Sequence, residues 1–115
     1  MDLKFEATES QGVSVLAVHG EVDVATAPRL RQRLVELATS GSTRAVIDLQ
    51  GVDFLDSTGL GVLVSGLKRF RTQGGDLLLA GPRRRILGVF EITGLDKVFA
   101  IHESVTDAVN AAAAG

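Results

Sequence analysis

Residues 46–64 constrain the fold of this chain more than any other stretch. They contain the apolar segment Val46-Ile-Asp-Leu49, then the polar turn Asp56-Ser-Thr-Gly59, then apolar residues at helical spacing. A strand that leads through one short turn into an amphipathic helix is typical of the crossover between two parallel strands. The continuous apolar run from Ala45 to Ile47 also favours a strand covered on both faces of its sheet. The stretch therefore predicts an α/β protein.

The flanking segments extend this pattern. Apolar alternation at 3–8 predicts a half-buried edge strand, which a hairpin turn joins antiparallel to the next strand. Leu30, Leu34 and Leu37 share one helical face behind Pro28, a residue that suits a first helical turn. Strands are expected at 3–8, 13–18, 44–49, 76–80 and 98–101, and helices from Thr26 to Gly41, from the central turn to Gln73, from 83 to 93 and from Ser104 onward. The prediction is one domain, 1–115, with a mixed, mostly parallel sheet of about five strands and about four helices in the order β-β-α-β-α-β-α-β-α. The alanine tail from Ala111 is expected to fray.

Composition excludes several classes of function. The chain has no cysteine, which rules out disulfides and thiolate metal sites and favours a reducing, cytoplasmic setting. Its net charge of −2 argues against general nucleic-acid binding. No apolar run approaches the roughly 18 residues of a membrane-spanning helix, and the N-terminus lacks a signal-peptide pattern. His19 and His102 stand alone, so no metal site and no cofactor are expected.

Two other groups of charged residues have ordinary interpretations. Arg83-Arg-Arg85 is interpreted as a solvated helix start, although three positive charges there oppose the helix dipole. Asp48, Asp53 and Asp56 are close in sequence, but Asp48 lies on a strand, and this spacing alone does not make a metal or acid/base site. Gly59-Leu-Gly61 is not a P-loop, because no Gly-Lys-Ser/Thr follows it. A nucleotide-hydrolysing enzyme is therefore disfavoured.

The central turn has both a structural and a functional interpretation. Asp56 or Ser57 would cap the following helix by accepting hydrogen bonds from its free N–H groups. The turn also follows a central strand, at the edge of the sheet where α/β proteins usually bind ligands. A phosphate on Ser57 would add about −1.5 to −2 charges at a helix N-terminus, which tolerates anions. The same phosphate would oppose a partner docked there, so Ser57 is predicted to be a binding switch.

The outer face of the central helix supports the functional interpretation. At 100° per residue, a buried stripe is expected from Leu60, Leu63, Val64 and Leu67. A small, uncharged surface is then predicted to point outward: Thr58, Gly61, Val62 and Ser65. Glycines at 59, 61 and 66 each lower helix stability by roughly 1 kcal/mol relative to alanine. Such a cost suggests close packing there, either by the protein's own sheet or by the backbone of a partner.

Four motifs together resemble a known family. They are Gly20-Glu-Val-Asp-Val-Ala-Thr-Ala-Pro28, Val46-Ile-Asp-Leu49, Val52-Asp-Phe-Leu-Asp-Ser-Thr-Gly-Leu-Gly-Val62 and Ile92-Thr-Gly-Leu-Asp-Lys-Val-Phe99. The chain resembles the anti-sigma factor antagonists, bacterial STAS domains, and is most similar to the actinobacterial antagonists of development and stress response. The resemblance spans essentially the whole chain, and the D-S-T-G-L-G block is its most specific part.

The resemblance implies a switching cycle. The unphosphorylated protein would bind an anti-sigma factor, a serine kinase of the histidine-kinase-like ATPase type, and release the sigma factor. The kinase would phosphorylate Ser57, with Thr58 as the fallback acceptor, and a PP2C-type phosphatase would restore the hydroxyl. Asp23 matches an acidic position near the phosphorylation site, although capping of the following helix would also explain it. The predicted partner-binding residues are Asp23, Asp56, Ser57, Thr58, Gly59, Gly61, Val62 and Ser65. The alternative is a STAS-type scaffold or a transporter-associated regulatory subunit.

Overall fold

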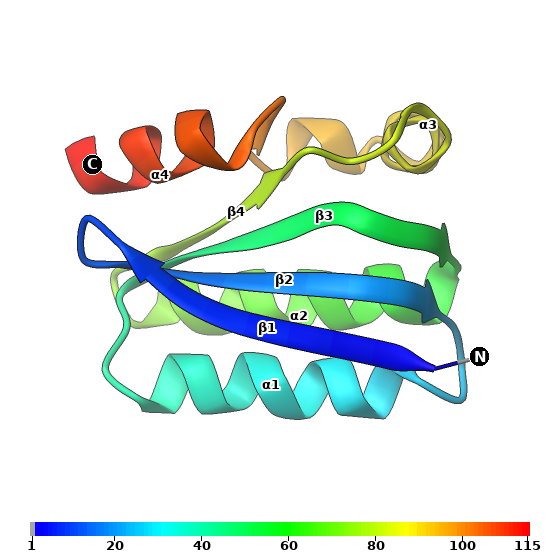
Figure 1. Cartoon of the computed structure of the whole chain (residues 1–115), viewed down its shortest axis with the longest axis horizontal. Helices are drawn as coiled ribbons and strands as arrows, with labels where there is room; N and C mark the ends of the chain where they lie inside the picture. Colours follow the sequence, from blue (N-terminus) through cyan, green and yellow to red (C-terminus); the bar gives the residue numbers. More distant parts are fainter. Residues whose placement is uncertain (1) are drawn as a thin grey trace.

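Five strands form one sheet in the order β1-β2-β3-β4-β5 (Figure 1). The structure is a computed structural model and describes residues 2–115. The strands are β1 (Leu3–Ser10), β2 (Val13–Val22), β3 (Arg44–Leu55), β4 (Asp76–Ala80) and β5 (Ile101–His102). The helices are α1 (Ala27–Thr39), α2 (Ser57–Thr72), α3 (Arg84–Thr93) and α4 (Val105–Ala114), with a 3-10 turn, η1, at Leu95–Lys97. Only the β1–β2 pair is antiparallel, so the predicted element order and the mostly parallel sheet with an antiparallel edge are confirmed.

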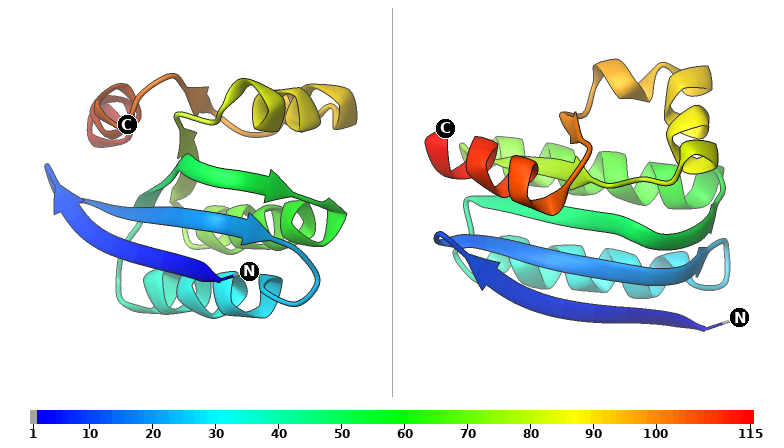
Figure 2. Two further views of the ribbon diagram at one scale, coloured as in Figure 1. Left: turned by 45° about the vertical axis from the view of Figure 1, so that its right-hand side comes forward. Right: turned by 45° about the horizontal axis from the view of Figure 1, so that its top comes forward.

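The central strands β3 and β4 are covered on both faces of the sheet, whereas most residues of the edge strand β1 are exposed. Helices α1 and α2 lie on one side of the sheet, and α4 lies on the other (Figures 1 and 2). Adjacent residues of β3 point to opposite sides: Ala45 and Ile47 join the larger core with α1 and α2, whereas Val46 joins the smaller core with α4. Leu78 of β4 likewise packs in the smaller core. A continuous apolar run is therefore required here, because neither face of these strands meets water.

Strand β3 continues six residues beyond the expected end at Leu49. Its pairing with β2 shifts twice; at the second shift Gly20 lies opposite Val52, and Glu21 opposite Phe54. Asp53 is the extra residue of this bulge, which changes the face to which the following side chains point. Leu55 is buried as a result, and Phe54 is left 47% exposed. The bulge thus determines which side chains reach the end of the sheet before α2 begins.

The predicted start of the last strand is wrong. The strand starts at Ile101 rather than residue 98, because α3 ends in left-handed Gly94 and residues 95–97 then form the 3-10 turn. The tail that was expected to fray is helical through Ala114, and Ala112, which is 3% exposed, packs in the smaller core. The predicted start of this helix at Ser104 is confirmed, since the Ser104 hydroxyl caps α4 by accepting a hydrogen bond from the backbone N–H of Asp107 at 3.0 Å.

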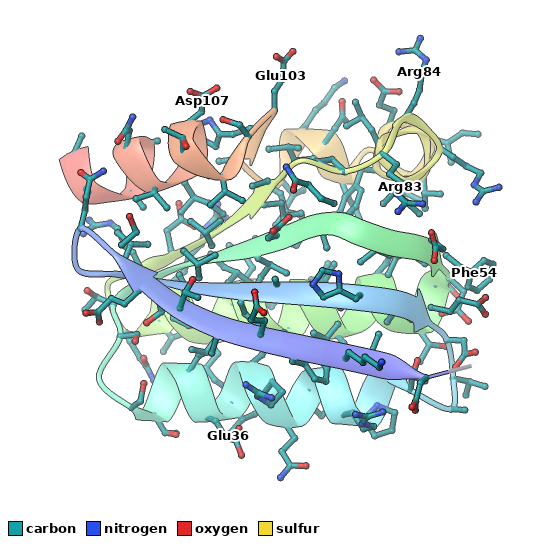
Figure 3. All side chains as sticks on the ribbon, in the orientation of Figure 1. Glu36, Phe54, Arg83, Arg84, Glu103 and Asp107 are labelled. Atoms are coloured by element: carbon teal, nitrogen blue, oxygen red, sulfur yellow. The ribbon has the colours of Figure 1, made fainter. Side chains whose placement is uncertain are left out.

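Two arginines at the start of α3 bind the end of β3. The Nε of Arg83 donates to the backbone oxygen of Gln50 at 2.9 Å, and its guanidinium pairs with the Asp53 carboxylate. Arg85 donates to the backbone oxygen of Asp53 at 2.9 Å. All three arginines are exposed, as the solvated interpretation expects, but only the Arg84 side chain simply extends away from the protein (Figure 3). These contacts hold α3 against the bulge in β3, which offsets the unfavourable charge at the helix start.

Candidate functional site

Asp56, not Ser57, caps helix α2. Its Oδ1 accepts a hydrogen bond from the backbone N–H of Gly59 at 3.1 Å, and the helix begins at the next residue. Ser57 therefore occupies the first helical position, with an exposed side chain. The hydroxyl of Ser57 is not used for capping. A chemical change at this oxygen would leave the cap of α2 in place.

Two loops leave the sheet side by side next to Ser57. Val22 and Leu55 pair as the last residues of the parallel strands β2 and β3, and the N–H of Asp56 donates to the oxygen of Val22 at 3.2 Å. Asp23 and Asp56 are thus the first residues beyond two neighbouring strand ends. Figure 1 shows this edge at the right of the sheet, where α2 also begins. The structure places Asp23 in the loop beside the start of α2, as the sequence predicted.

Asp23 organises its own loop. Its Oδ1 accepts hydrogen bonds from the backbone N–H groups of Ala25 at 2.9 Å and Thr26 at 3.0 Å. Thr26 precedes α1 but makes no side-chain capping bond to it; its buried hydroxyl donates to the oxygen of Glu21 at 2.8 Å and accepts from the N–H of Asp23 at 2.9 Å. These bonds fix the path of the chain between β2 and α1. A positioning role for Asp23 is therefore visible in the fold itself.

The hydrogen bonds to Asp23 predict an acid-dependent contribution to stability. The Thr26 backbone N–H is the main cause that holds the pKa of the Asp23 carboxyl below its ordinary value of 3.8, and partial desolvation opposes it. Because the pKa is lowered in the folded state, the contribution is complete above the ordinary value and is lost as pH falls through the folded value. We expect the carboxyl carbon of Asp23 to titrate below 3.8 by NMR. Asp23→Asn should lack the part of the acid-induced loss of stability that comes from protonation of Asp23. A titration midpoint of Asp23 at its ordinary pKa would contradict the effect assigned to the hydrogen bonds.

Two of the predicted surface residues are buried. Val62 is 3% exposed and lines the junction between α1 and α2 with Leu34, because α2 contacts α1 as well as the sheet and so buries a wider arc than one stripe. Gly59 is buried, and a Cβ built there would lie 2.5 Å from Leu55 Cδ1 and 2.6 Å from Val22 Cγ1. Neither residue therefore presents an exposed side chain on the outer surface of α2. The prediction that both belong to the partner-binding surface is corrected.

The remaining predicted residues lie at the surface. Thr58, Gly61 and Ser65 are exposed with Ser57 on one side of α2, and Asp23 and Asp56 are partly exposed at its start. Gly61 differs from the other two glycines of α2, because a Cβ there would meet nothing within 4 Å. The protein's own packing thus explains the glycines at 59 and 66 but leaves the one at 61 unexplained. A smooth, uncharged surface of smaller extent than predicted begins at Ser57.

Sequence analysis missed two exposed apolar residues near this end of the sheet. Val24, in the loop after β2, is 72% exposed, and Phe54, near the end of β3, is 47% exposed. Figure 3 places Phe54 at the edge where β3 leads into α2. The bulge that exposes Phe54 leaves no signal in a single sequence, because period-two alternation cannot identify an extra residue. Val24 and Phe54 therefore add exposed apolar area at the end of the sheet from which α2 begins.

Within residues 2–115, no group of three or more His, Asp or Glu side chains is arranged to hold a metal ion. In the same range, no helix combines the length and apolarity needed to cross a bilayer.

Comparison with known proteins decides the family. The model of the family described as STAS domain matches residues 4–108. The chain belongs to the STAS domain family. An anti-sigma-B factor antagonist of Bacillus subtilis (strain 168) is 37% identical to this STAS domain over 101 residues, which cover 88% of the chain and 92% of the relative.

Solved structures share the fold of this STAS domain. A crystal structure of an anti-sigma factor antagonist from Mycobacterium paratuberculosis is 31% identical, with a TM-score of 0.88 and coverage of 96% of this chain and 94% of that chain. SpoIIAA from Bacillus has been solved unphosphorylated and phosphorylated. Its two forms are 18% and 19% identical to this chain, with TM-scores of 0.79 and 0.72, and both cover 93% of it. They cover 94% and 97% of the respective SpoIIAA chains, and at this identity the likeness concerns the fold alone.

Proposed function

We propose that this STAS domain is an anti-sigma factor antagonist that is switched by phosphorylation of Ser57. The unphosphorylated protein binds an anti-sigma factor and so releases a sigma factor. The 37% identity to the anti-sigma-B factor antagonist of Bacillus subtilis supports this role. The observation that carries the proposal is structural: the Asp56 carboxylate caps α2 and leaves the exposed Ser57 hydroxyl available for modification.

The position of Ser57 accounts for both properties of a switch. A phosphate at the first position of a 16-residue helix lies close to free backbone N–H groups and the positive end of the dipole, so the fold tolerates it. A docked partner would instead cover the phosphate beside the Asp56 carboxylate. Covering a charge without a matching cation costs several kcal/mol. This is a large part of the binding free energy of a micromolar complex, which is roughly 8 kcal/mol. Phosphorylation therefore releases the partner.

The domain acts in this cycle as a substrate and a binding partner, not as an enzyme. The anti-sigma factor supplies the kinase activity through an ATPase domain of the histidine-kinase-like type. A PP2C-type phosphatase removes the phosphate, and the cycle runs in the cytoplasm. The surface that meets the kinase comprises Ser57, Thr58, Gly61 and Ser65, bordered by the loop of Asp23 and by the exposed side chains of Val24 and Phe54.

Mass spectrometry tests the acceptor directly. The purified chain is incubated with ATP and each candidate anti-sigma factor kinase from the same genome. We expect one phosphate, located on Ser57 by fragmentation. Ser57→Ala should abolish it, and Thr58→Ala, the matched control one residue away, should retain it. A phosphate on Thr58 that persists in Ser57→Ala would overturn the assignment, and the absence of phosphate with every candidate kinase would count against the proposed function.

A further inference from the structure

The basic residues of this protein are concentrated on two helices. Helix α1 contains Arg29, Arg31 and Arg33, and α2 contains Lys68, Arg69 and Arg71. These six are half of the twelve lysines and arginines in a chain whose net charge is −2. The same two helices contain only one of the fourteen acidic residues, Glu36. Helices α1 and α2 are therefore basic, although the protein as a whole is weakly acidic.

Half of these cations have no carboxylate of their own. Arg29, Arg33 and Arg71 pair with Asp2, Glu36 and Asp76 respectively. Within the described residues, Arg31, Lys68 and Arg69 form no ion pair and are exposed. Three unneutralised cations on neighbouring helices repel one another, so the arrangement costs stability unless an anion joins it.

The unpaired cations surround two adjoining hollows. One, of about 40 Å³, lies between α1 and α2 and is lined by Arg31 and Arg69 above an apolar floor that includes Leu34 and Val62. The other, of about 370 Å³, is lined by Lys68, Arg69 and the end of α2. Both include Ser65. The smaller hollow has room for one compact polar group between two guanidinium groups, which is a suitable place for a carboxylate.

This basic surface continues the surface that begins at Ser57. Thr58, Gly61, Ser65 and Arg69 follow one another at helical spacing and are all exposed. Arg69 is the twelfth residue after Ser57, so the two positions lie about 18 Å apart along the helix axis at about 1.5 Å per residue. One face of α2 is thus neutral and smooth at its N-terminal end and basic at its C-terminal end. A partner that contacts Ser57 and lies along α2 must also cover the basic end.

We propose that the kinase docks along this whole face of α2 and inserts acidic side chains between Arg31 and Arg69, about 18 Å from its contact with Ser57. The inference rests on the proposed function, because it describes the same partner. An acidic protein surface fits better than nucleic acid or anionic lipid. Three of the six cations are already neutralised internally, and two of the remaining three, Arg31 and Arg69, line one small hollow that has room for one compact group.

The distance between the two ends separates their roles. Screening at physiological salt reduces interactions between exposed charges over about 8 to 10 Å, less than the length from Ser57 to Arg69. The basic end therefore cannot neutralise a phosphate on Ser57. It contributes affinity, orientation and association rate in the unphosphorylated state, and it leaves the inhibitory effect of the phosphate intact.

A charge-reversal experiment tests this docking surface. The probe is the kinase that phosphorylates the wild-type chain, and its affinity for unphosphorylated protein is measured by calorimetry at about 50 mM and about 300 mM salt. Arg31→Glu/Arg69→Glu should raise Kd by about tenfold or more at low salt and reduce the salt dependence. Arg84→Glu, the same substitution at an exposed arginine on α3, is the control and should bind as wild type. Because all these positions are exposed on helices, the variants should melt within a few degrees of wild type; Arg31→Ala/Arg69→Ala replaces the reversal if that pair does not fold.

The outcomes separate this inference from the proposed function. If Arg31→Glu/Arg69→Glu binds the kinase with the Kd of the wild type and is still phosphorylated on Ser57, the proposed docking surface is wrong. The proposed switch at Ser57 is then unaffected. Failure of the wild-type chain to bind any candidate kinase would overturn the proposed function. Binding of the wild-type chain to duplex DNA or to phosphatidylglycerol vesicles at physiological salt, lost in the double variant while kinase binding is unchanged, would reassign the basic face. A selective loss of kinase affinity, with KM for phosphorylation raised and kcat unchanged, would support the proposal.

Discussion

Ser57→Asp is expected to weaken binding of the anti-sigma factor kinase by about a hundredfold or more while leaving the fold intact. The substituted carboxylate would stand at the first position of α2, where the dipole favours an anion by about 0.3–1 kcal/mol. Its side chain would be exposed, and the capping bond from Asp56 to Gly59 would remain. In the complex the charge would be covered, and a desolvation cost near 3 kcal/mol corresponds to about a hundredfold loss of affinity.

An uncharged variant of similar size separates charge from bulk. Ser57→Asn has nearly the same volume as Ser57→Asp and should lose much less affinity, and Ser57→Ala should bind constitutively because it cannot be phosphorylated. Affinities are measured by calorimetry, and thermal melting checks the fold of each variant. Equal affinity of the alanine and aspartate variants would refute the switch. Equal losses for asparagine and aspartate would assign the effect to bulk, contrary to the electrostatic mechanism.

The fold could be predicted because local and long-range signals agree in most of the chain. Continuous apolar runs identified the doubly covered strands β3 and β4, and the end of α3 coincided with a glycine in the left-handed conformation. The prediction failed where tertiary contacts override the local pattern. The alanines of α4 have no stripe of large apolar residues, yet Ala108 and Ala112 pack closely in the smaller core.

The sequence predicts the turn at the centre of the candidate site, but not which of the surrounding residues are buried or exposed. The turn from Asp56 to Gly59 carries its own capping chemistry, so its role as the start of a helix follows from local sequence. The orientation of Val62 depends on the packing of α1 against α2, which helical periodicity alone does not contain. Phe54 is exposed by a bulge opposite Gly20 and Glu21, which is a property of two strands together. Sequence therefore located the start of α2 and the position of Ser57, and the structure defines which residues around them are exposed.

Gly59→Ala is expected to lower the free energy of unfolding by about 2–3 kcal/mol. Gly61→Ala, in the same helix, is expected to have a smaller effect of opposite sign. The methyl added at 59 would lie 2.5 Å from Leu55 Cδ1 and 2.6 Å from Val22 Cγ1. Both side chains are nearly fully buried and are supplied by neighbouring strands, so neither can move without disturbing the core. Overpacking of this kind typically costs 1–3 kcal/mol. The thermal midpoint should fall by roughly 10 °C.

Gly61→Ala is the matched control two residues further along α2. Neither glycine has a positive φ, so alanine causes no backbone strain at either position. A methyl at 61 meets nothing within 4 Å, and its effect should be the gain in helix propensity, a stabilisation of up to about 1 kcal/mol. Chemical denaturation of both variants measures the difference. Equal stabilities would contradict the packing of Gly59 between β2 and β3. Gly61→Ala can also be more stable than wild type and yet bind the kinase more weakly. That result would mean that the partner packs against Gly61 in the complex, because nothing in the free protein packs there.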